Sequence, residues 1–250
     1  MTNQNITVCI AVYNGGEFLS QQLESILSQI TPNDEIIIVD DCSSDKSLEI
    51  INKYLDSRIF VIKNHKNLGP NKTFEKAIYL ANNNFIFLSD QDDIWLPGRI
   101  NLMKEELIES EALLLSSNTG FIDVNNNIIN IPQNNYQGVK RINSNKYFSN
   151  IKDIFIGVDN YYGCGMVFKK ELVKVILPFP SFIESHDLWI AKCANILKSN
   201  IHLEKNTLNR RLHENNYSTK KRSLRLKIYS RIIFLFSIFI ILIRIIKNEN

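Results

Sequence analysis

Several patterns that mark common protein classes are missing from this chain of 250 residues. No GxGxxG follows the first strand-like run and no GxxxxGK[ST] occurs anywhere, which disfavours a dinucleotide oxidoreductase and a P-loop NTPase. The polar residues 1–5 lead directly into that run, so we expect no N-terminal signal peptide. The cysteines form no CxxC pair and have no regular spacing, which favours buried free thiols in a reducing compartment: Cys9, Cys42, Cys164 and Cys193.

A large excess of charge is also missing, since the net charge is only +3, but the charge is unevenly distributed. Residues 205–250 carry eleven Lys and Arg against two Glu, a net charge of +9, which leaves −6 on residues 1–204. An acidic body argues against a protein that coats nucleic acid, and we predict no nucleic-acid partner. The basic tail is expected to face an anionic partner.

The first 90 residues alternate between short apolar runs and helical spacing. This order predicts an α/β protein whose mostly parallel sheet is covered on both faces. The expected strands are 6–12, 35–39, 59–62 and 85–88, and the expected helices are 17–29, 44–54 and 70–81.

Polar residues follow each expected strand: Tyr13-Asn14, Asp40-Asp41, residues 64–67 and residues 90–93. In open α/β sheets, ligands bind beyond the carboxyl ends of the strands. We therefore expect these four segments to meet in one binding site.

The loop Asp90-Gln91-Asp92-Asp93 is the strongest candidate for chemistry. Three carboxylates so close together repel one another, and a hard divalent cation held with substrate phosphates would compensate for this. A solvated turn that caps the helix beginning near Pro97 is the alternative. The preceding apolar strand and the other polar strand ends favour the metal.

Two further polar groups lie later in the chain. His186-Asp187 stand at the start of an expected helix, where Asp187 is either a general base or a helix cap. Arg211 and His213 belong to a polar set that could hold a diphosphate or complete a metal shell, although a solvated linker fits the composition equally well.

The second half is less regular. We expect helices at 97–107 and 186–197, strands at 112–116 and 163–168, and an Asn-rich surface loop at 125–137. At the end, residues 220–231 carry six basic residues and residues 232–243 are apolar except for Ser237. Twelve residues make a helix of about 18 Å, which is short for about 30 Å of hydrocarbon. A basic helix lying in the membrane interface is preferred, with a spanning helix or a core or oligomer helix as alternatives.

The order of the motifs resembles an inverting family 2 glycosyltransferase of the GT-A fold, in particular rhamnosyltransferase-like bacterial enzymes. The matching segments are VCIAVYN (8–14), IVDDCSSD (38–45), NLG (67–69), FLSDQDDIW (87–95), GCGM (163–166), HD (186–187) and RLHENNYS (211–218). Ala11 stands where the family usually has Pro, and His186 stands where many members have an acidic residue. The resemblance covers residues 5–218.

The resemblance implies a role for each matching residue. Asp187 would be the catalytic base, and Asp92 with His213 would bind Mg²⁺ or Mn²⁺. Asp90 would lie nearer the ribose or the sugar. The residues that bind nucleotide and donor would be Tyr13, Asn14, Asp40, Asp41, Asn67, Lys72, Asp90 and Arg211.

The sequence and the resemblance together predict a glycosyltransferase domain at 1–218 and a membrane-associating helix at 219–250. The enzyme would move a sugar with inversion from a UDP- or dTDP-sugar to a glycan or lipid-linked acceptor in bacterial surface polysaccharide synthesis. It would be cytoplasmic, attached peripherally to the anionic inner face of the cell membrane. A non-catalytic nucleotide-binding partner with the same fold and a sugar nucleotidyltransferase are the alternatives.

Overall fold

A mixed sheet of eight strands forms the centre of the protein. The computed structural model describes residues 4–130, 138–157, 161–213 and 224–249. The strands lie in the order β3-β2-β1-β4-β7-β6-β8-β5. Their bounds are β1 Ile6–Val12, β2 Glu35–Asp40, β3 Ile59–Lys63, β4 Phe85–Ser89, β5 Ile94–Trp95, β6 Leu114–Ile122, β7 Met166–Lys169 and β8 Asn200–Arg211.

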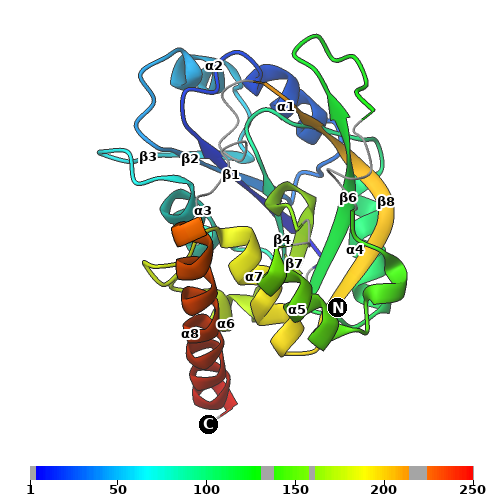
Figure 1. Ribbon diagram of the computed structural model, residues 1–250. Helices are drawn as coiled ribbons and strands as arrows, with labels where there is room; N and C mark the ends of the chain where they lie inside the picture. The colour runs from blue at the N-terminus through cyan, green and yellow to red at the C-terminus, as the bar shows by residue number, and fades with distance from the viewer. Residues whose placement is uncertain (1–3, 131–137, 158–160, 214–223, 250) are drawn as a thin grey trace.

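Helices cover both faces of this sheet (Figure 1). Strands β2 and β4 are buried at every position, as expected for parallel strands between two helical layers. The side chains of β1 alternate between two cores: Cys9 packs with helices α3, α5, α7 and α8, and Val8 and Ile10 pack with α1, α2 and α4. The helices are α1 Leu19–Leu27, α2 Ser47–Lys53, α3 Pro70–Leu80, α4 Arg99–Glu109, α5 Tyr147–Ile156, α6 Val173–Ile176, α7 His186–Ile196 and α8 Leu224–Glu249.

Strand direction decides which loops meet. Strands β1 to β4 are parallel, β7 runs antiparallel to β4 and to β6, and β8 is parallel to β6. Strands β6 and β8 therefore point the same way as β4. As a result, the end of β8 and the start of β7 lie at the same edge of the sheet as the four polar strand ends.

The expected α/β architecture is confirmed, and the four N-terminal strands and three helices between them occur where the sequence predicted them. The expected strand at 163–168 is partly wrong, because Gly163–Gly165 form a 3-10 turn and only Met166–Lys169 form a strand. Four of the named strands and α-helices were not predicted: β5, α5, the short α6 and the twelve-residue β8. The Asn-rich segment contains an isolated bridge between Ile128 and Ile122, and its residues 131–137 lie outside the described part.

The expectation of free thiols is confirmed, because all four cysteines are unpaired and all but Cys42 are buried. Burial raises the pKa of the Cys193 thiol to about 12, so this thiol stays protonated and unreactive at neutral pH.

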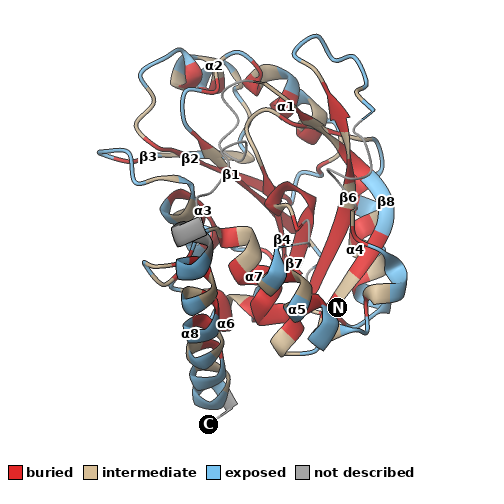
Figure 2. Cartoon of the chain, viewed as in Figure 1, coloured by how far each residue is buried: buried red, intermediate tan, exposed pale blue. Residues whose placement is uncertain are grey.

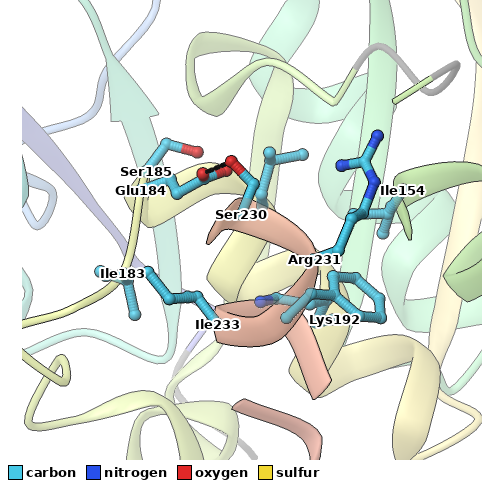
Figure 3. A pocket seen from close by; sticks show the side chains of 10 residues that line it. Ile154, Ile183, Glu184, Ser185, Lys192, Ser230, Arg231 and Ile233 are labelled. Atoms are coloured by element: carbon cyan, nitrogen blue, oxygen red, sulfur yellow. Dashed lines mark hydrogen bonds between the residues drawn. The ribbon is translucent and has the colours of Figure 1, made fainter. Parts of the chain in front are cut away.

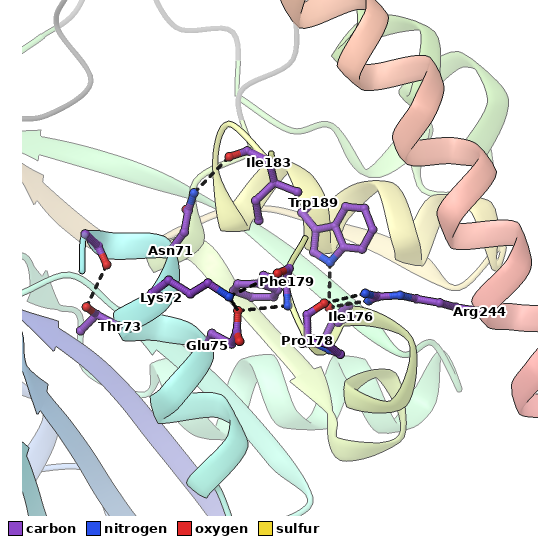
Figure 4. Close-up of polar contacts among 11 residues, drawn as sticks. Asn71, Lys72, Thr73, Glu75, Ile176, Pro178, Phe179, Ile183, Trp189 and Arg244 are labelled. Carbon is purple, nitrogen blue, oxygen red and sulfur yellow. Dashed lines mark hydrogen bonds and ion pairs between the residues drawn. The ribbon is translucent and has the colours of Figure 1, made fainter. Parts of the chain in front are cut away.

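Helix α8 is longer than the apolar core of the tail indicated, and one of its faces packs against the protein (Figure 1). Ser230, Phe234, Ser237 and Ile241 are buried, at spacings of three and four residues that place them on one helical face. Arg244 donates hydrogen bonds to the carbonyls of Val175, Ile176 and Pro178 at the end of α6, as Figure 4 shows for Ile176. A cation at a helix C-terminus satisfies its last carbonyls, so Arg244 fastens α8 to α6.

The opposite face of α8 is exposed (Figure 2). It presents large apolar side chains along most of the helix: Ile228, Tyr229, Ile232, Leu235, Phe236, Phe239, Leu242, Ile243 and Ile246. By length and composition, Ile228–Asn248 is sufficient to cross a membrane. The basic cluster at 220–227 lies outside the described side chains.

Candidate active site

The acidic loop lies between β4 and β5, and β5 ties it to β8. Ile94 pairs with Asn209 and Trp95 with Leu208. The next residues of β8, Arg210 and Arg211, therefore lie beside the acidic loop. Two segments more than 100 residues apart in sequence are brought together by this short antiparallel pairing.

Asp90, Asp93 and Cys164 offer ligand atoms that all lie within 4.8 Å of one another. Burial, the charge of Asp92 and, more weakly, that of Asp187 raise the pKa of Asp90 to about 6, while Arg210 opposes the shift. Burial and the charges of Asp92 and Asp90 raise the pKa of Asp93 well above its usual range. The negative charge of the acidic cluster is thus only partly balanced by Arg210, a nearby cation.

Arg210 is held beside these carboxylates by the ring of Tyr162, 4.4 Å from its guanidinium carbon. Burial disfavours the charge of Arg210, but Cys164, Asp90 and Asp93 outweigh this effect and raise its pKa. The sequence interpretation did not single out Arg210. Neighbouring residues on a strand point to opposite faces, so Arg210 and Arg211 would have been distinguished if residues 200–211 had been predicted as a strand. They were not.

The two predicted metal ligands are in contact. His213 Nε2 lies 2.7 Å from Asp92 Oδ2, and both side chains are largely buried. The His213 ring also packs against Phe18, with ring centroids 5.4 Å apart. The segment that follows, 214–218, lies outside the described part.

These donors fit a hard divalent cation. Carboxylate oxygens and an imidazole nitrogen suit Mg²⁺ or Mn²⁺, and the clustered carboxylates need positive charge in addition to that of Arg210. Burial and the charges of Asp93 and Asp90 raise the pKa of Cys164 well above its usual range, so its thiol stays protonated and is a poor metal ligand. The remaining ligand candidates are Asp90 with Asp93, which lie together, and Asp92 with its partner His213.

A second part of the site is formed where β1 and β2 end. Gln91 pairs its side-chain amide with the backbone of Tyr13, accepting from the amide nitrogen at 2.8 Å and donating to the carbonyl at 3.1 Å. Asn14 accepts from the Ser44 amide at 2.8 Å. The Tyr13 ring remains 48% exposed, available to stack on a flat ligand.

Asp40 and Asp41 have separate roles. Asp40 accepts a hydrogen bond from the Ser43 amide through Oδ2, and its buried Oδ1 has no hydrogen-bond partner among the described residues. A buried acceptor without a partner is costly and suits a donor N–H supplied by a ligand. Asp41, by contrast, accepts from Asn64 and from the amides of Leu68 and Gly69, so it orders the loop after β3.

Asn67 and Lys72 lie at the edge of this region. Asn67 accepts from the Gly69 amide at 3.0 Å, just before α3 begins. Lys72 forms an ion pair with Glu75 at 2.8 Å, and Glu75 accepts from the Phe179 amide at 3.1 Å (Figure 4). Lys72 therefore joins α3 to the segment that leads into α7.

The start of α7 is fixed by Asn71. Its Oδ1 accepts from the His186 amide at 2.9 Å, and its amide donates to the Ile183 carbonyl at 3.3 Å (Figure 4 shows the second bond). The His186 ring stacks on Phe74 at 4.2 Å, and burial lowers its pKa. A Cβ on Gly163 would lie 2.8 Å from His186 Nε2, so the glycine allows α7 to approach the sheet edge closely.

Asp187, next to His186, is brought close enough to the acidic loop for its charge to act on Asp90. It is half-buried and accepts only the adjacent Leu188 amide, at 2.8 Å, among the printed contacts of the described residues. Asp187, at the start of α7, and Asp90, at the end of β4, are therefore near enough for their charges to interact.

Arg211 is placed differently from Arg210. Its backbone amide donates to Asp93 Oδ1 at 3.1 Å, and its guanidinium donates to the carbonyls of Asp92 and Asp123 and to the side chains of Gln21 and Asn126. The guanidinium also lies 4.5 Å from the centre of the Phe18 ring. Arg211 therefore holds the acidic loop in place.

Comparison with known proteins agrees with this architecture. The family model described as glycosyl transferase family 2 matches residues 7–177. A glycosyltransferase of Methanocaldococcus jannaschii is 32% identical over 233 residues, which is 90% of this chain and 77% of that protein. The UDP-Glc:alpha-D-GlcNAc-diphosphoundecaprenol beta-1,3-glucosyltransferase of Escherichia coli is 36% identical over 118 residues, 47% of each protein. The chain thus spans about half the length of the E. coli enzyme.

Solved structures share the fold at low sequence identity. TarS of S. aureus in complex with UDP-GlcNAc superposes with a TM-score of 0.71 at 20% identity, covering 94% of this chain and 66% of that one. A mannosyltransferase of Pyrobaculum calidifontis in complex with GDP-Man and Mn²⁺ gives 0.66 at 17% identity, covering 96% and 65%. The GT-A fold predicted from the sequence is confirmed. Since the family model covers more than half of the chain and the M. jannaschii relative most of it, the chain belongs to glycosyl transferase family 2.

Proposed function

We propose that this protein transfers a sugar, with inversion at the anomeric carbon, from a nucleoside-diphosphate donor to an acceptor hydroxyl in bacterial surface polysaccharide synthesis. The observation that carries the proposal is the meeting of Asp90, Asp92, Arg210 and Asp187 at one sheet edge. Family membership supports the reaction class, and the E. coli relative named above acts on a lipid diphosphate acceptor.

The nucleoside side of the donor would occupy the ends of β1 and β2. The exposed ring of Tyr13 would stack on the base, and Asp40 Oδ1 would accept a base N–H. Uracil and thymine offer such a donor at N3–H, as guanine does at N1–H, so the proposed UDP- or dTDP-sugar is tested against GDP in the donor panel below.

The diphosphate would lie over the acidic loop. Arg210 would neutralise part of its charge in place of Arg211, whose guanidinium already binds protein acceptors. Asp90, Asp92 and His213 would hold Mg²⁺ or Mn²⁺, which when bound would act as a Lewis acid on the leaving diphosphate.

Asp187 would act as the base. It would accept the proton of the acceptor hydroxyl while that oxygen bonds to the anomeric carbon and the bond to the diphosphate breaks. Attack from the face opposite the leaving group gives inversion. A carboxylate needs to take the proton only as the new bond forms, which typically contributes about 10²–10⁴-fold to the rate.

The exposed face of α8 supports attachment to the inner face of the membrane. The helix is fastened to the protein from Ser230 to Asn248, so lipid cannot surround it on all sides. We therefore favour a helix lying in the interface with its apolar face in the bilayer. The double substitution Phe239→Glu with Leu242→Glu should reduce sedimentation with anionic vesicles at least tenfold without lowering the melting temperature. If it sediments like wild type, α8 is not the anchor.

A donor panel tests the reaction. Purified protein with Mn²⁺ should be stabilised against heat by UDP or dTDP but not by GDP, and should then consume the matching activated sugar in the presence of a lipid diphosphate acceptor. NMR of the product gives its anomeric configuration. Transfer that persists unchanged in excess chelator, or a product with retained configuration, would contradict the proposal.

A further inference from the structure

An apolar groove of about 180 Å³ runs between α5 and α8, away from the nucleotide side of the protein. It is lined by Phe148, Ile151, Phe155, Phe234 and Leu235, with Lys152 as its one charged lining residue among those described. Phe148 and Leu235 are 84% and 60% exposed. Contiguous apolar surface of this kind on a soluble domain marks an interaction site.

A second, smaller hollow of about 30 Å³ adjoins the groove and differs in chemistry (Figure 3). The two share Phe234, and the polar lining of the smaller one includes Lys192, Arg231 and Glu184, whose carboxylate accepts a hydrogen bond from Ser230. It reaches Ser185, the residue that precedes α7 and stands two positions before Asp187. An apolar groove is thus followed by a more polar hollow that reaches the residue before α7.

Arg231 stands where the groove and the hollow meet. Its guanidinium carbon lies 5.3 Å from the centre of the Phe155 ring, and Phe155 lines the groove. Figure 3 shows the Arg231 side chain beside Ile154. Lys152 lines the groove itself, and Arg231 and Lys192 outnumber the one carboxylate, Glu184, among the described residues that line the hollow. An apolar channel that ends at cations is complementary to an alkyl chain that ends in a phosphate.

We propose that this groove binds part of the hydrocarbon chain of an acceptor sugar linked to a lipid diphosphate, with the diphosphate at Arg231 and the sugar directed toward Asp187. The inference rests on the proposed function and names its acceptor subsite. Leu235 belongs both to the groove and to the exposed apolar face of α8. A chain can therefore pass from the bilayer into the groove along α8 without crossing water.

Chain length should control the affinity. Burying one methylene group contributes enough free energy to tighten binding about fourfold. Because the groove is small, this gain should hold for the first several methylenes next to the phosphate and then level off, with the rest of a natural chain staying in the membrane.

Calorimetric titration of the full chain with dodecyl phosphate, below its critical micelle concentration and without vesicles, tests the groove. Dodecyl phosphate should bind at least tenfold more tightly than hexyl phosphate, and inorganic phosphate should not bind measurably. Arg231→Gln should weaken dodecyl phosphate binding about tenfold and leave binding of dodecyl maltoside, which has a neutral head, unchanged.

Two matched pairs separate the groove from general apolar surface. Leu235→Glu should weaken dodecyl phosphate binding at least tenfold, whereas Leu242→Glu, also exposed on α8 but outside the groove, should not. Phe148→Ser should weaken it and Ile156→Ser, on the same helix, should not. All four side chains are substantially exposed, so the variants are expected to fold. Equal effects within both pairs would overturn the proposal.

Other outcomes are also decisive. If wild type dimerises and Leu235→Glu makes it monomeric while dodecyl phosphate does not bind, the groove is a contact between two copies of the chain. If the groove variants bind dodecyl phosphate normally while wild type transfers sugar, the groove proposal fails and the proposed function stands. If dodecyl phosphate binds as expected but no donor sugar is consumed, the groove still binds an alkyl phosphate and the proposed function fails.

Discussion

His213 Nε2 lies 2.7 Å from Asp92 Oδ2, although 121 residues separate the two in sequence. The contact depends on two strand pairings, β5 with β8 and β8 with β6. It brings an imidazole to the acidic loop, where it can either share a cation with Asp92 or only hold the carboxylate in place.

A double-mutant cycle on this pair tests the metal site. Asp92→Asn should lower kcat/KM at least about 100-fold, and His213→Gln about 10-fold, since partners of metal ligands typically contribute 10- to 100-fold. Mn²⁺ binding followed by electron paramagnetic resonance should weaken in both variants, and their effects should not add, because the residues are in contact. Glu109→Gln, at the exposed end of α4, is the control. If both variants bind Mn²⁺ like wild type, the pair is structural.

The neighbours Arg210 and Arg211 should give opposite phenotypes. Arg210→Gln should lose at least tenfold in affinity for a nucleoside diphosphate, a larger loss than in Arg211→Gln, because its guanidinium is the cation beside the acidic cluster. Arg211→Gln should lose about 2 kcal/mol of stability, because it leaves several part-buried acceptors without a donor. Thermal unfolding and nucleotide titration of the two purified variants measure both effects. The reverse result would show that Arg211 is the donor-binding residue, as the sequence motif suggested.

Replacing Asp187 should separate turnover from binding. Asp187→Asn should reduce turnover by about 10²–10⁴-fold and leave nucleotide-dependent thermal stabilisation unchanged, since the residue is proposed to act only on the acceptor proton. Asp153→Asn, on α5, is the matched control. A normal rate in Asp187→Asn would mean that another group takes the proton.

Lys192, which contacts α8, should make the stability of the protein depend on pH. Burial lowers the pKa of Lys192 to about 8, against the weaker opposing effects of Cys193 and Glu184, and its ammonium donates to Ser237 on α8 at 2.7 Å. An unfolded chain would titrate near 10.5. Between these values the unfolded state binds more protons, so the stability of the protein should rise with pH from about 8 to 10.5, and the cost of the buried charge is fully present below 8.

Lys192→Met removes the charge and keeps the length of the side chain. Urea unfolding at a series of pH values should show a smaller rise above pH 8 in this variant than in wild type. Ser237 keeps its bond to the Phe234 carbonyl, so the substitution leaves no buried hydroxyl without a partner. Parallel stability curves for the two proteins would show that Lys192 does not titrate in this range.

The elements predicted correctly are those in which burial follows a regular pattern along the sequence. β2 and β4 are apolar runs buried on both faces, and the intervening helices carry regular apolar spacing. β8 was missed because its exposed, buried and half-buried positions follow no regular alternation, and its pairing with β6 contains register shifts at Asn118. Irregular strands are common near binding sites, so the signal failed in the region that completes the site.

The sequence alone was sufficient to indicate the acidic loop, the polar strand ends and Asp187, because each stands next to an element with a strong local pattern. Only the tertiary structure decided which of these residues can contact a ligand and which bind other parts of the protein. The pairing of β5 with β8 brings Arg210 to the carboxylates, and alternation along β8 turns Arg211 toward protein carbonyls. The loop after β3 occupies Asp41, whereas Asp40 Oδ1 has no partner among the described residues.

The same limit applies to α8. Its apolar residues occur all round the helix, so the sequence could not show which face packs against α6 and α7 and which stays exposed. Periodicity is a local property of the chain, whereas strand pairing and helix docking join residues far apart in sequence. For this protein, the local pattern determined which residues are available for chemistry, and long-range packing determined which of them face a ligand.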